Sequence, residues 1–179
     1  EKGLRFRAIV NNAGFFRGES LDTTKLNDWN RIITLNQTVP FFLVRDLHNM
    51  IDNGGSIVNI SSLHGVLASG YGYAYQASKA ALIHMTRGVA KELAPSIRVN
   101  CIIAGFIRTD MTAEMHSDEM SSNYIKSLSL MGRWGEPEDV AETVKFLISD
   151  KASYITGQSI TIDGGLSLTV ASGNSSFTR

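Results

Sequence analysis

Residues 56–103 read SIVNI, SSLHGVLASGYG, YAYQASKAALIHMTRGVAKEL, APS and IRVNCII in order, and this stretch decides the fold. The branched apolar runs at 56–60 and 97–103 predict two strands. The run at 73–93 between them predicts a helix, which Pro95 stops. A helix of that length between two strands is typical of a βαβ unit, in which both strands run parallel.

The same alternation of strand and helix continues on both sides of this unit. Apolar residues recur at three- and four-residue steps over about 25–51 and predict a helix with one apolar face. We expect Pro40 to kink that helix and the Asn53–Gly55 segment to end it. The further predicted elements are strands at 6–10 and 159–162, short helices and loops at 109–132, and a helix at 137–149.

This order of elements predicts one α/β domain over residues 1–170, with a doubly wound parallel sheet covered by helices on both faces. Residues 171–179 are rich in Ser, Gly and Asn, and we expect a flexible tail there. Ligands of such sheets bind beyond the carboxyl ends of the strands. The segments 11–14, 61–72 and 104–111 are therefore expected to line one crevice.

Composition excludes several classes of function. Among the 179 residues, 17 Lys and Arg balance 17 Asp and Glu, and this neutrality argues against a nucleic-acid partner. No run approaches the roughly 18 apolar residues of a membrane span. A single cysteine, Cys101, and four scattered histidines argue against a metal site. We expect a soluble domain in the cytoplasm, although a targeting signal ahead of Glu1 would lie outside this sequence.

Tyr75 and Lys79 are four residues apart on the predicted helix, so their side chains share one face. An ammonium beside a phenol favours the phenolate and lowers its pKa from about 10, which would allow proton transfer. A packed tyrosine beside a surface lysine is the simpler explanation of the pair on its own. Ser62 follows the 56–60 strand and could donate to a substrate oxygen, or cap local backbone.

Two further features near the crevice have both a structural and a functional interpretation. Asn36 falls on the apolar stripe of the 25–51 helix, where a carboxamide is costly unless it is hydrogen bonded. It is either satisfied by the protein, or its amide or a freed carbonyl holds an ordered water near Lys79. The small residues at 11–14 would let a flat ligand approach the backbone, or form a simple tight turn.

Several catalytic motifs are absent from the sequence. No Gly-x-Ser-x-Gly elbow exists, which excludes the usual serine-hydrolase turn. No Gly-x-x-x-x-Gly-Lys-Ser/Thr exists, which excludes a P-loop NTPase. The nearest approach to Gly-x-G-x-x-G is Gly70-Tyr-Gly72, which lacks the third glycine.

An ordered set of short motifs runs through nearly the whole chain. In order they are Asn-Asn-Ala-Gly (11–14), Asn36, Ser61-Ser62 with Gly65, Tyr75-x-x-x-Lys79, Arg98-Val-Asn100, Gly105-Phe-Ile107-x-Thr109, Gly132–Pro137, Phe146-Leu147, Ser153–Gly157 and Asp163–Gly165. Together they resemble the classical short-chain dehydrogenase/reductase family. The resemblance implies a Rossmann-type fold, NAD or NADP as cofactor, and hydride transfer between an alcohol and a carbonyl.

The resemblance also implies a role for each matching residue. Tyr75 would be the general acid/base, and Lys79 would lower its pKa and hold the nicotinamide ribose. Ser62 would polarise the substrate oxygen, and Asn36 would anchor a water in the proton relay. The resemblance implies that Tyr75 and Lys79 also bind the cofactor, Lys79 at the nicotinamide ribose. It further implies Asn12, Ala13 and Gly14 at the adenosine-side ribose, and Ile107 (by its backbone) and Thr109 at the carboxamide. The Met-rich segment 111–131 resembles a substrate lid.

Two departures from the family pattern stand out. Ala104 replaces the usual proline before the glycine of the third crevice loop, which should loosen that loop. The family's glycine-rich phosphate loop and first strands precede the 6–10 strand and lie outside this sequence. We therefore expect an N-terminally truncated chain with an open sheet edge at 6–10 that binds a dinucleotide poorly by itself.

The primary hypothesis is an oxidoreductase that uses NAD(P) and a small, largely apolar alcohol or ketone, for example a 3-oxoacyl or ketone reductase. By analogy with the family we expect a homo-oligomer, a tetramer or dimer, through the helices that hold Asn36 and Tyr75 and through the C-terminal strand. A non-catalytic remnant or scaffold is the alternative that the missing phosphate loop favours. A sugar-nucleotide epimerase or dehydratase of the extended branch shares Tyr-x-x-x-Lys but needs a larger C-terminal domain than can follow Gly165.

Overall fold

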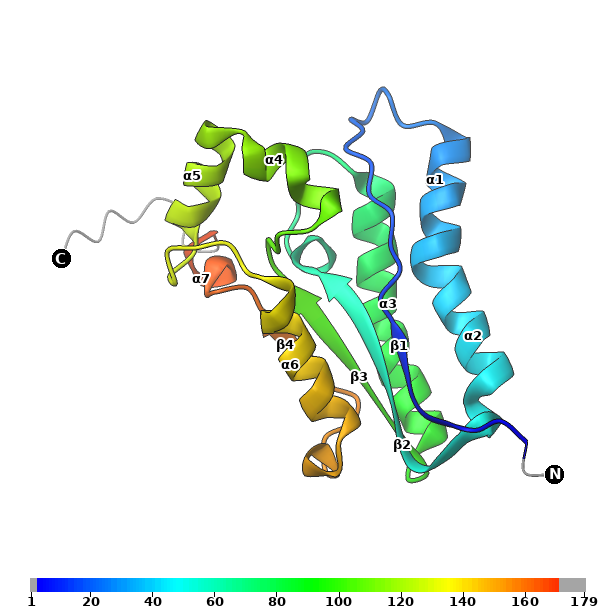
Figure 1. Ribbon diagram of the computed structural model, residues 1–179. Coiled ribbons are helices and arrows are strands. Elements are labelled where there is room, and N and C mark those ends of the chain that lie inside the picture. The colour runs from blue at the N-terminus through cyan, green and yellow to red at the C-terminus, as the bar shows by residue number, and fades with distance from the viewer. Residues whose placement is uncertain (1–2, 171–179) are drawn as a thin grey trace.

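The computed structural model describes residues 3–170 and arranges them in three layers, with a parallel sheet between two groups of helices (Figure 1). The strands pair in the order β1-β2-β3-β4, and every pairing is parallel. The strands are β1 (Phe6–Asn11), β2 (Ile51–Ser62), β3 (Ile97–Ala104) and β4 (Ser159–Ile162). The predicted Rossmann-type sheet is confirmed; the predicted tail at 171–179 lies outside the described residues.

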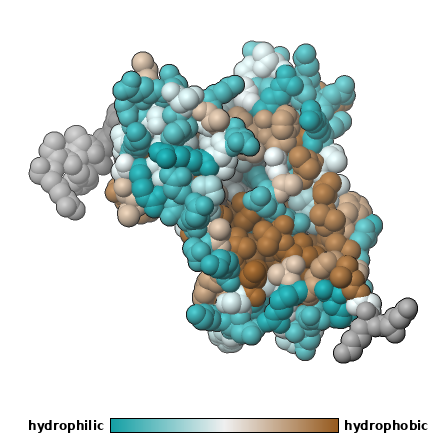
Figure 2. All heavy atoms as spheres, in the orientation of Figure 1, coloured by the Kyte–Doolittle hydropathy of each residue, from teal (hydrophilic) through white to brown (hydrophobic). Residues whose placement is uncertain are grey.

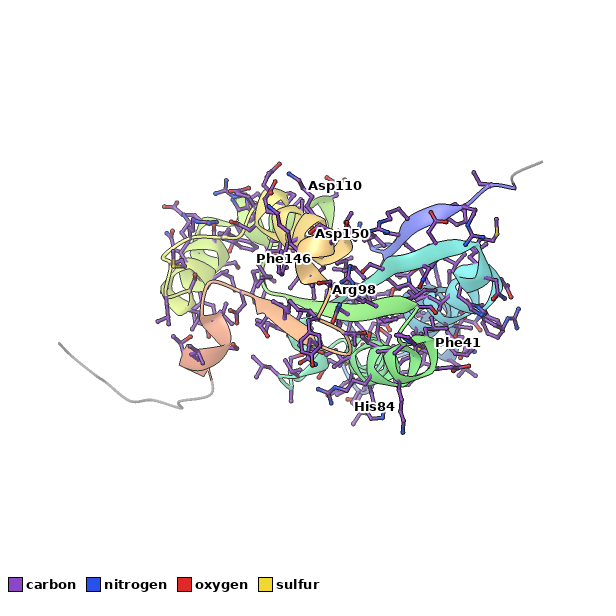
Figure 3. All side chains as sticks on the ribbon, turned by 90° about the horizontal axis from the view of Figure 1, so that it is seen from below. Phe41, His84, Arg98, Asp110, Phe146 and Asp150 are labelled. Carbon is purple, nitrogen blue, oxygen red and sulfur yellow. The ribbon has the colours of Figure 1, made fainter. Side chains whose placement is uncertain are left out.

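The helices lie on both faces of the sheet, as predicted. They are α1 (Leu26–Ile33), α2 (Val39–Leu47), α3 (Tyr73–Leu93), α4 (Ala113–Ser117), α5 (Glu119–Leu128), α6 (Pro137–Ile148) and α7 (Leu166–Val170). Figure 3 shows α3 on one side of the sheet and α6 on the other. The 109–132 segment contains the short helices α4 and α5, as expected, whereas α7 was not predicted.

The long predicted helix is neither continuous nor as long as expected. A π-helical segment, Thr34–Thr38, separates α1 from α2 directly before Pro40. A proline has no N–H to donate to the carbonyl four residues earlier, so the regular helix cannot pass through this point unchanged. The irregularity expected at Pro40 therefore takes the form of a π-helical turn.

The prediction that Asn53–Gly55 ends this helix was wrong. A 3₁₀ turn, His48–Met50, follows α2, and Ile51 already pairs with Phe6 of β1. Gly54 and Gly55 lie inside β2, where a Cβ atom on Gly55 would come 2.9 Å from the carbonyl oxygen of Arg7. These glycines allow a neighbouring strand to come close, and the register of β1 against β2 shifts there.

The two faces of the sheet bury different apolar clusters, because successive strand residues point to opposite sides. On the α3 side, Ile57 and Val99 pack with Ala90 and Val44. On the α6 side, Val58 and Ile102 pack with Leu147 and Ala152. The sheet is thus held from both sides, which fixes the loops at its carboxyl edge.

Arg98 ties α6 to the sheet. Its side chain is 7% exposed and donates to the carbonyl oxygen of Leu147 at 2.8 Å and to that of Ser149 at 3.1 Å. These carbonyls belong to the end of α6, where the helix leaves its acceptors unpaired and carries partial negative charge. Figure 3 shows Arg98 beneath this end, near Asp150. The Arg98 guanidinium therefore caps α6 from the sheet.

β1 is an edge strand within the described part of the chain, since it pairs there with β2 alone. The predicted open edge is confirmed for residues 3–170. Over the same residues, no helix combines the length and the apolar character that crossing a bilayer requires. The cytoplasmic location stays a prediction.

Candidate active site

The three loops at the carboxyl edge of the sheet line one cavity of about 930 Å³, as predicted. Its lining comes from the 12–14 and 61–64 segments, from 104–107 and 109–112, and from Tyr75 and Lys79 of α3. The face of α6 carrying Val140 and Val144 adds a further wall that the sequence did not indicate. Figure 2 shows apolar side chains gathered in this hollow, over the strands and beside α6.

Tyr75 and Lys79 lie one turn apart on the buried face of α3, with exposed fractions of 8% and 4%. The Nζ atom of Lys79 is 5.6 Å from the centroid of the Tyr75 ring. It donates a hydrogen bond of 2.8 Å to the carbonyl oxygen of Ile60. The simpler explanation, a surface lysine at helical spacing, is therefore wrong for Lys79, which crosses from the helix to the end of β2.

Burial sets the charge of Lys79. Desolvation lowers the pKa of its ammonium from 10.5 to about 8. The electrostatic interaction with the Cys101 thiol acts in the opposite direction and raises the pKa of Lys79. At neutral pH the ammonium keeps its proton but sits near its midpoint, so modest changes in its surroundings will change its charge.

Ser62 joins the phenol from the neighbouring loop. It is the N-cap of the 3₁₀ turn Leu63–Gly65, and its Oγ accepts the backbone N–H of His64 at 3.2 Å. A hydrogen bond between Ser62 and the phenol acts to lower the pKa of Tyr75. The hydroxyl of Ser61 donates to the backbone carbonyl of Lys79 at 2.8 Å and fixes this loop against α3. The structure thus brings Ser62, Tyr75 and Lys79 together.

The predicted shift of the tyrosine is not found. Burial raises the pKa of Tyr75 above 10.0, and this outweighs the opposing hydrogen bond from Ser62. Lys79 makes no resolved contribution because its ammonium points to the carbonyl of Ile60 rather than to the phenol oxygen. In this state the phenol keeps its proton and is suited to act as an acid.

Asn36 is fully buried in the π-helical segment, and its amide is satisfied by protein groups. Its Oδ1 accepts the N–H of Phe15 at 2.8 Å, and its Nδ2 donates to the carbonyl of Phe15 at 2.9 Å and to Ser78 at 3.1 Å. Both N–H bonds of this amide are used by protein groups, so the amide clamps the first crevice loop. A water held by its Oδ1 or by the backbone carbonyl of Asn36 stays a prediction.

The residues expected to hold the cofactor all lie along the cavity. Asn12, Ala13 and Gly14 line it on the β1 side, and Ile107 and Thr109 line it on the β3 side. Gly14 lies beside the ammonium, since a Cβ atom there would be in van der Waals contact, at 3.4 Å, with the Nζ of Lys79. The carbonyl oxygen of Ile107 accepts the hydroxyl of Thr112 at 2.7 Å, which fixes the backbone of the third loop.

Sequence reasoning missed the aromatic wall of the cavity. Phe16, His64, Tyr71 and Phe106 all line it, together with Tyr75. His64 could have been found, because it follows Ser62 by two residues on a predicted crevice loop. Nothing local marks Phe16 or Tyr71, whose positions depend on how the loops fold over the edge of the sheet. Among residues 3–170, no three His, Cys, Asp or Glu side chains are grouped to hold a metal ion.

Comparison with known proteins agrees with this geometry. A family model described as Enoyl-(Acyl carrier protein) reductase matches residues 1–167. The crystal structure of a short-chain dehydrogenase/reductase from Brucella melitensis superposes with a TM-score of 0.87 at 30% identity, covering 90% of this chain and 65% of that one. The chain belongs to the short-chain dehydrogenase/reductase family.

Two further family members are close in sequence. The 3-oxoacyl-(acyl-carrier-protein) reductase FabG of Aquifex aeolicus is 43% identical over 161 residues, which are 88% of this chain and 64% of that protein. A 4-hydroxyisoleucine dehydrogenase mutant complexed with NADH and succinate is 36% identical with a TM-score of 0.88, covering 92% of this chain and 70% of that one. The chain spans about two thirds of the length of the curated relatives it matches.

Gly65 provides a test of how the Ser62 turn rests on α3. A Cβ atom at Gly65 would lie 2.8 Å from the backbone carbonyl carbon of Lys79 and 3.0 Å from the backbone nitrogen of Ala80. We predict that Gly65→Ala lowers the free energy of unfolding by about 1–3 kcal/mol, because helix or turn must move. Urea unfolding followed by circular dichroism measures this change.

Gly88 on the same helix is the matched control. It is exposed, and a Cβ atom there would have nothing within 4 Å. Gly88→Ala should raise the free energy of unfolding by up to about 1 kcal/mol, since alanine favours a helix. If Gly65→Ala unfolded at the same urea concentration as the wild type, the turn would not be in close contact with the backbone of α3.

Proposed function

We propose that this chain carries the catalytic part of an NAD(P)-dependent oxidoreductase that interconverts a carbonyl compound and an alcohol. The observation that supports this most is the convergence of Ser62, Tyr75 and Lys79 in one largely apolar cavity. A phenol, a hydroxyl and an ammonium lie close together here, away from bulk water. This combination is typical of a proton-transfer site rather than of a metal-binding site or a nucleophile with a general base.

The residues present fit the nicotinamide end of the cofactor. Lys79 has three N–H bonds and, within residues 3–170, one hydrogen bond, to Ile60; two N–H bonds are left for ribose hydroxyls. Gly14 lies beside the ammonium. We assign the adenosine-side ribose to Asn12, Ala13 and Gly14, and the carboxamide to the backbone of Ile107 and to Thr109. The cofactor, when bound, supplies or takes up the hydride.

The protein groups then handle the oxygen and the proton. During reduction the carbonyl carbon gains the hydride, and the phenol of Tyr75 gives its proton to the oxygen. Ser62 donates a hydrogen bond to the same oxygen as negative charge develops on it. The raised pKa of Tyr75 keeps the phenol protonated for this step. In oxidation the phenolate takes up the proton that the alcohol loses.

The substrate we propose is a small, largely apolar ketone or alcohol, with 3-oxoacyl compounds as the leading example. Phe16, Phe106, Met111 and Met115 give the cavity apolar walls. Two of these come from the lid segment, whose flexible methionine side chains adapt to apolar groups. The similarity to the 3-oxoacyl-(acyl-carrier-protein) reductase supports this substrate class.

Tyr75→Phe tests the proposed proton transfer. The substitution removes the phenolic proton but keeps the ring. In the complete protein we therefore predict a fall in kcat of about 10³-fold, with NADH or NADPH binding changed less than threefold. Steady-state ketone reduction and fluorescence titration of the reduced cofactor measure the two effects. Wild-type turnover by Tyr75→Phe would remove Tyr75 from its role.

Tyr73→Phe is the matched control on the same helix. The Tyr73 hydroxyl donates to the carbonyl oxygen of Gly70 at 3.3 Å and lies outside the cavity lining. This variant should turn over ketone like the wild type. A wild-type protein that binds neither NADH nor NADPH would instead support the non-catalytic scaffold.

We also propose a homo-oligomer formed through α2 and its neighbours. Val39, Phe41, Phe42 and Leu43 are each about two fifths exposed, and Figure 3 shows Phe41 on the outer side of the helices, away from Phe146 and Asp150. Such an apolar group on one helix is typical of a covered surface. We predict a dimer or tetramer by light scattering and a monomer for Phe41→Asp. A monomeric wild type would contradict this proposal.

A further inference from the structure

His64 stands among aromatic rings on the wall of the cavity. Its ring centroid lies 5.9 Å from those of Tyr71 and Tyr75, 6.2 Å from that of Phe16 and 6.5 Å from that of Phe106. The rings of Tyr71, Tyr75 and Phe106 meet it nearly edge to face, at 86–88°. The four neighbours hold the imidazole in place through contacts that do not use its nitrogens.

The two ring nitrogens of His64 have no protein partner among the described residues. The hydrogen bond that His64 makes to Ser62 uses its backbone N–H. Within residues 3–170, the only fully buried side-chain N or O atom without a partner is Oγ of Ser159, so the ring nitrogens of His64, a residue of the cavity lining, are not sealed off from solvent. An imidazole held by packing, with its polar atoms open to a ligand cavity, is placed to bind a polar group of the ligand.

We propose that His64 is a specificity-determining residue that hydrogen bonds a second oxygen of the substrate, next to the carbonyl that is reduced. The substrate class is that of 3-oxoacyl esters, thioesters and amides. This inference rests on the proposed reduction of a carbonyl by Tyr75.

The position of His64 relative to Ser62 supports a second oxygen nearby. Ser62 and Tyr75 bind the reacting oxygen, and the backbone N–H of His64 lies 3.2 Å from the Oγ of Ser62. The centroid of the imidazole lies 5.9 Å from that of the Tyr75 ring, so the imidazole and the phenol share one wall of the cavity. A carbonyl two carbons from the reacting one offers the imidazole an acceptor, whereas a simple ketone offers only hydrocarbon.

The charge of the ring favours a neutral oxygen. Burial lowers the pKa of His64 below 6.5, so the imidazole is neutral at pH 7. A neutral imidazole donates from one nitrogen, which suits the carbonyl oxygen of an ester or thioester. The aromatic neighbours then form an apolar wall for the rest of the acyl group.

Paired substrates separate hydrogen bonding from packing. The probes are the acetoacetyl thioester of N-acetylcysteamine, which has the second oxygen, and 2-pentanone, which lacks it. His64→Phe keeps an aromatic ring and removes the nitrogens. We predict a fall in kcat/KM of about tenfold for the thioester, the value of one hydrogen bond, and a change below threefold for 2-pentanone. His64→Gln should recover most of the loss.

His84→Phe is the control, because His84 is exposed on the outer side of α3 (Figure 3) and should change neither rate. Equal losses on both substrates, or no loss on either, would overturn the assignment of His64. A wild type that reduces neither substrate would overturn the proposed reduction itself.

A binding measurement decides the role of His64 apart from turnover. The ring proton resonance of His64 is identified by its loss in His64→Phe and followed by NMR as acetoacetamide or 2-butanone is added. We predict a shift of this resonance with acetoacetamide and none with 2-butanone, while the other three histidines stay unchanged. No shift, or the same shift with both compounds, would overturn the proposal.

Discussion

The hydrogen bond from the Nζ of Lys79 to the carbonyl oxygen of Ile60 is the contact on which the site depends. It joins α3 to the end of β2 at 2.8 Å, with the lysine side chain almost completely buried. A buried ammonium is costly unless a polar group receives it, and here one strand carbonyl does so. The hydroxyl of Ser61 returns a hydrogen bond to the backbone of Lys79, so the strand and the helix hold each other.

The first crevice loop is fitted around the same ammonium. Gly14 lies beside Lys79, and the amide of Asn36 binds both backbone polar groups of Phe15. Asn36 lies in the π-helical turn Thr34–Thr38, which interrupts the regular helix at this point. The same hydrogen bonds therefore pack the loop and hold the site residues in position. This explains why polar residues are buried here although their burial costs free energy.

The sequence predicted the fold from local patterns. It predicted the centre of the site only through the family resemblance, because the Tyr75–Lys79 pair on its own has a simpler explanation. The alternation of strands and helices predicted the parallel sheet. Because ligands of such sheets bind beyond the carboxyl ends of the strands, Ser62 was expected in the same crevice as the Tyr75–Lys79 pair. What could not be predicted depends on contacts between distant segments. Asn36 binding Phe15, Gly55 lying inside a strand, and α6 forming a wall of the cavity are examples. The raised pKa of Tyr75 belongs with them, since burial depends on the whole fold.

The charge of Lys79 tests this account most directly. The pKa of about 8 in the folded chain lies below the 10.5 of an exposed lysine. Between these values the unfolded chain holds a proton that the folded chain has lost, so the free energy of unfolding should rise with pH. The titration is followed by NMR on the ¹³Cε resonance of Lys79, identified by its loss in Lys79→Arg. We predict a midpoint near 8, and a midpoint at or above 10 would contradict a buried ammonium at the centre of the site.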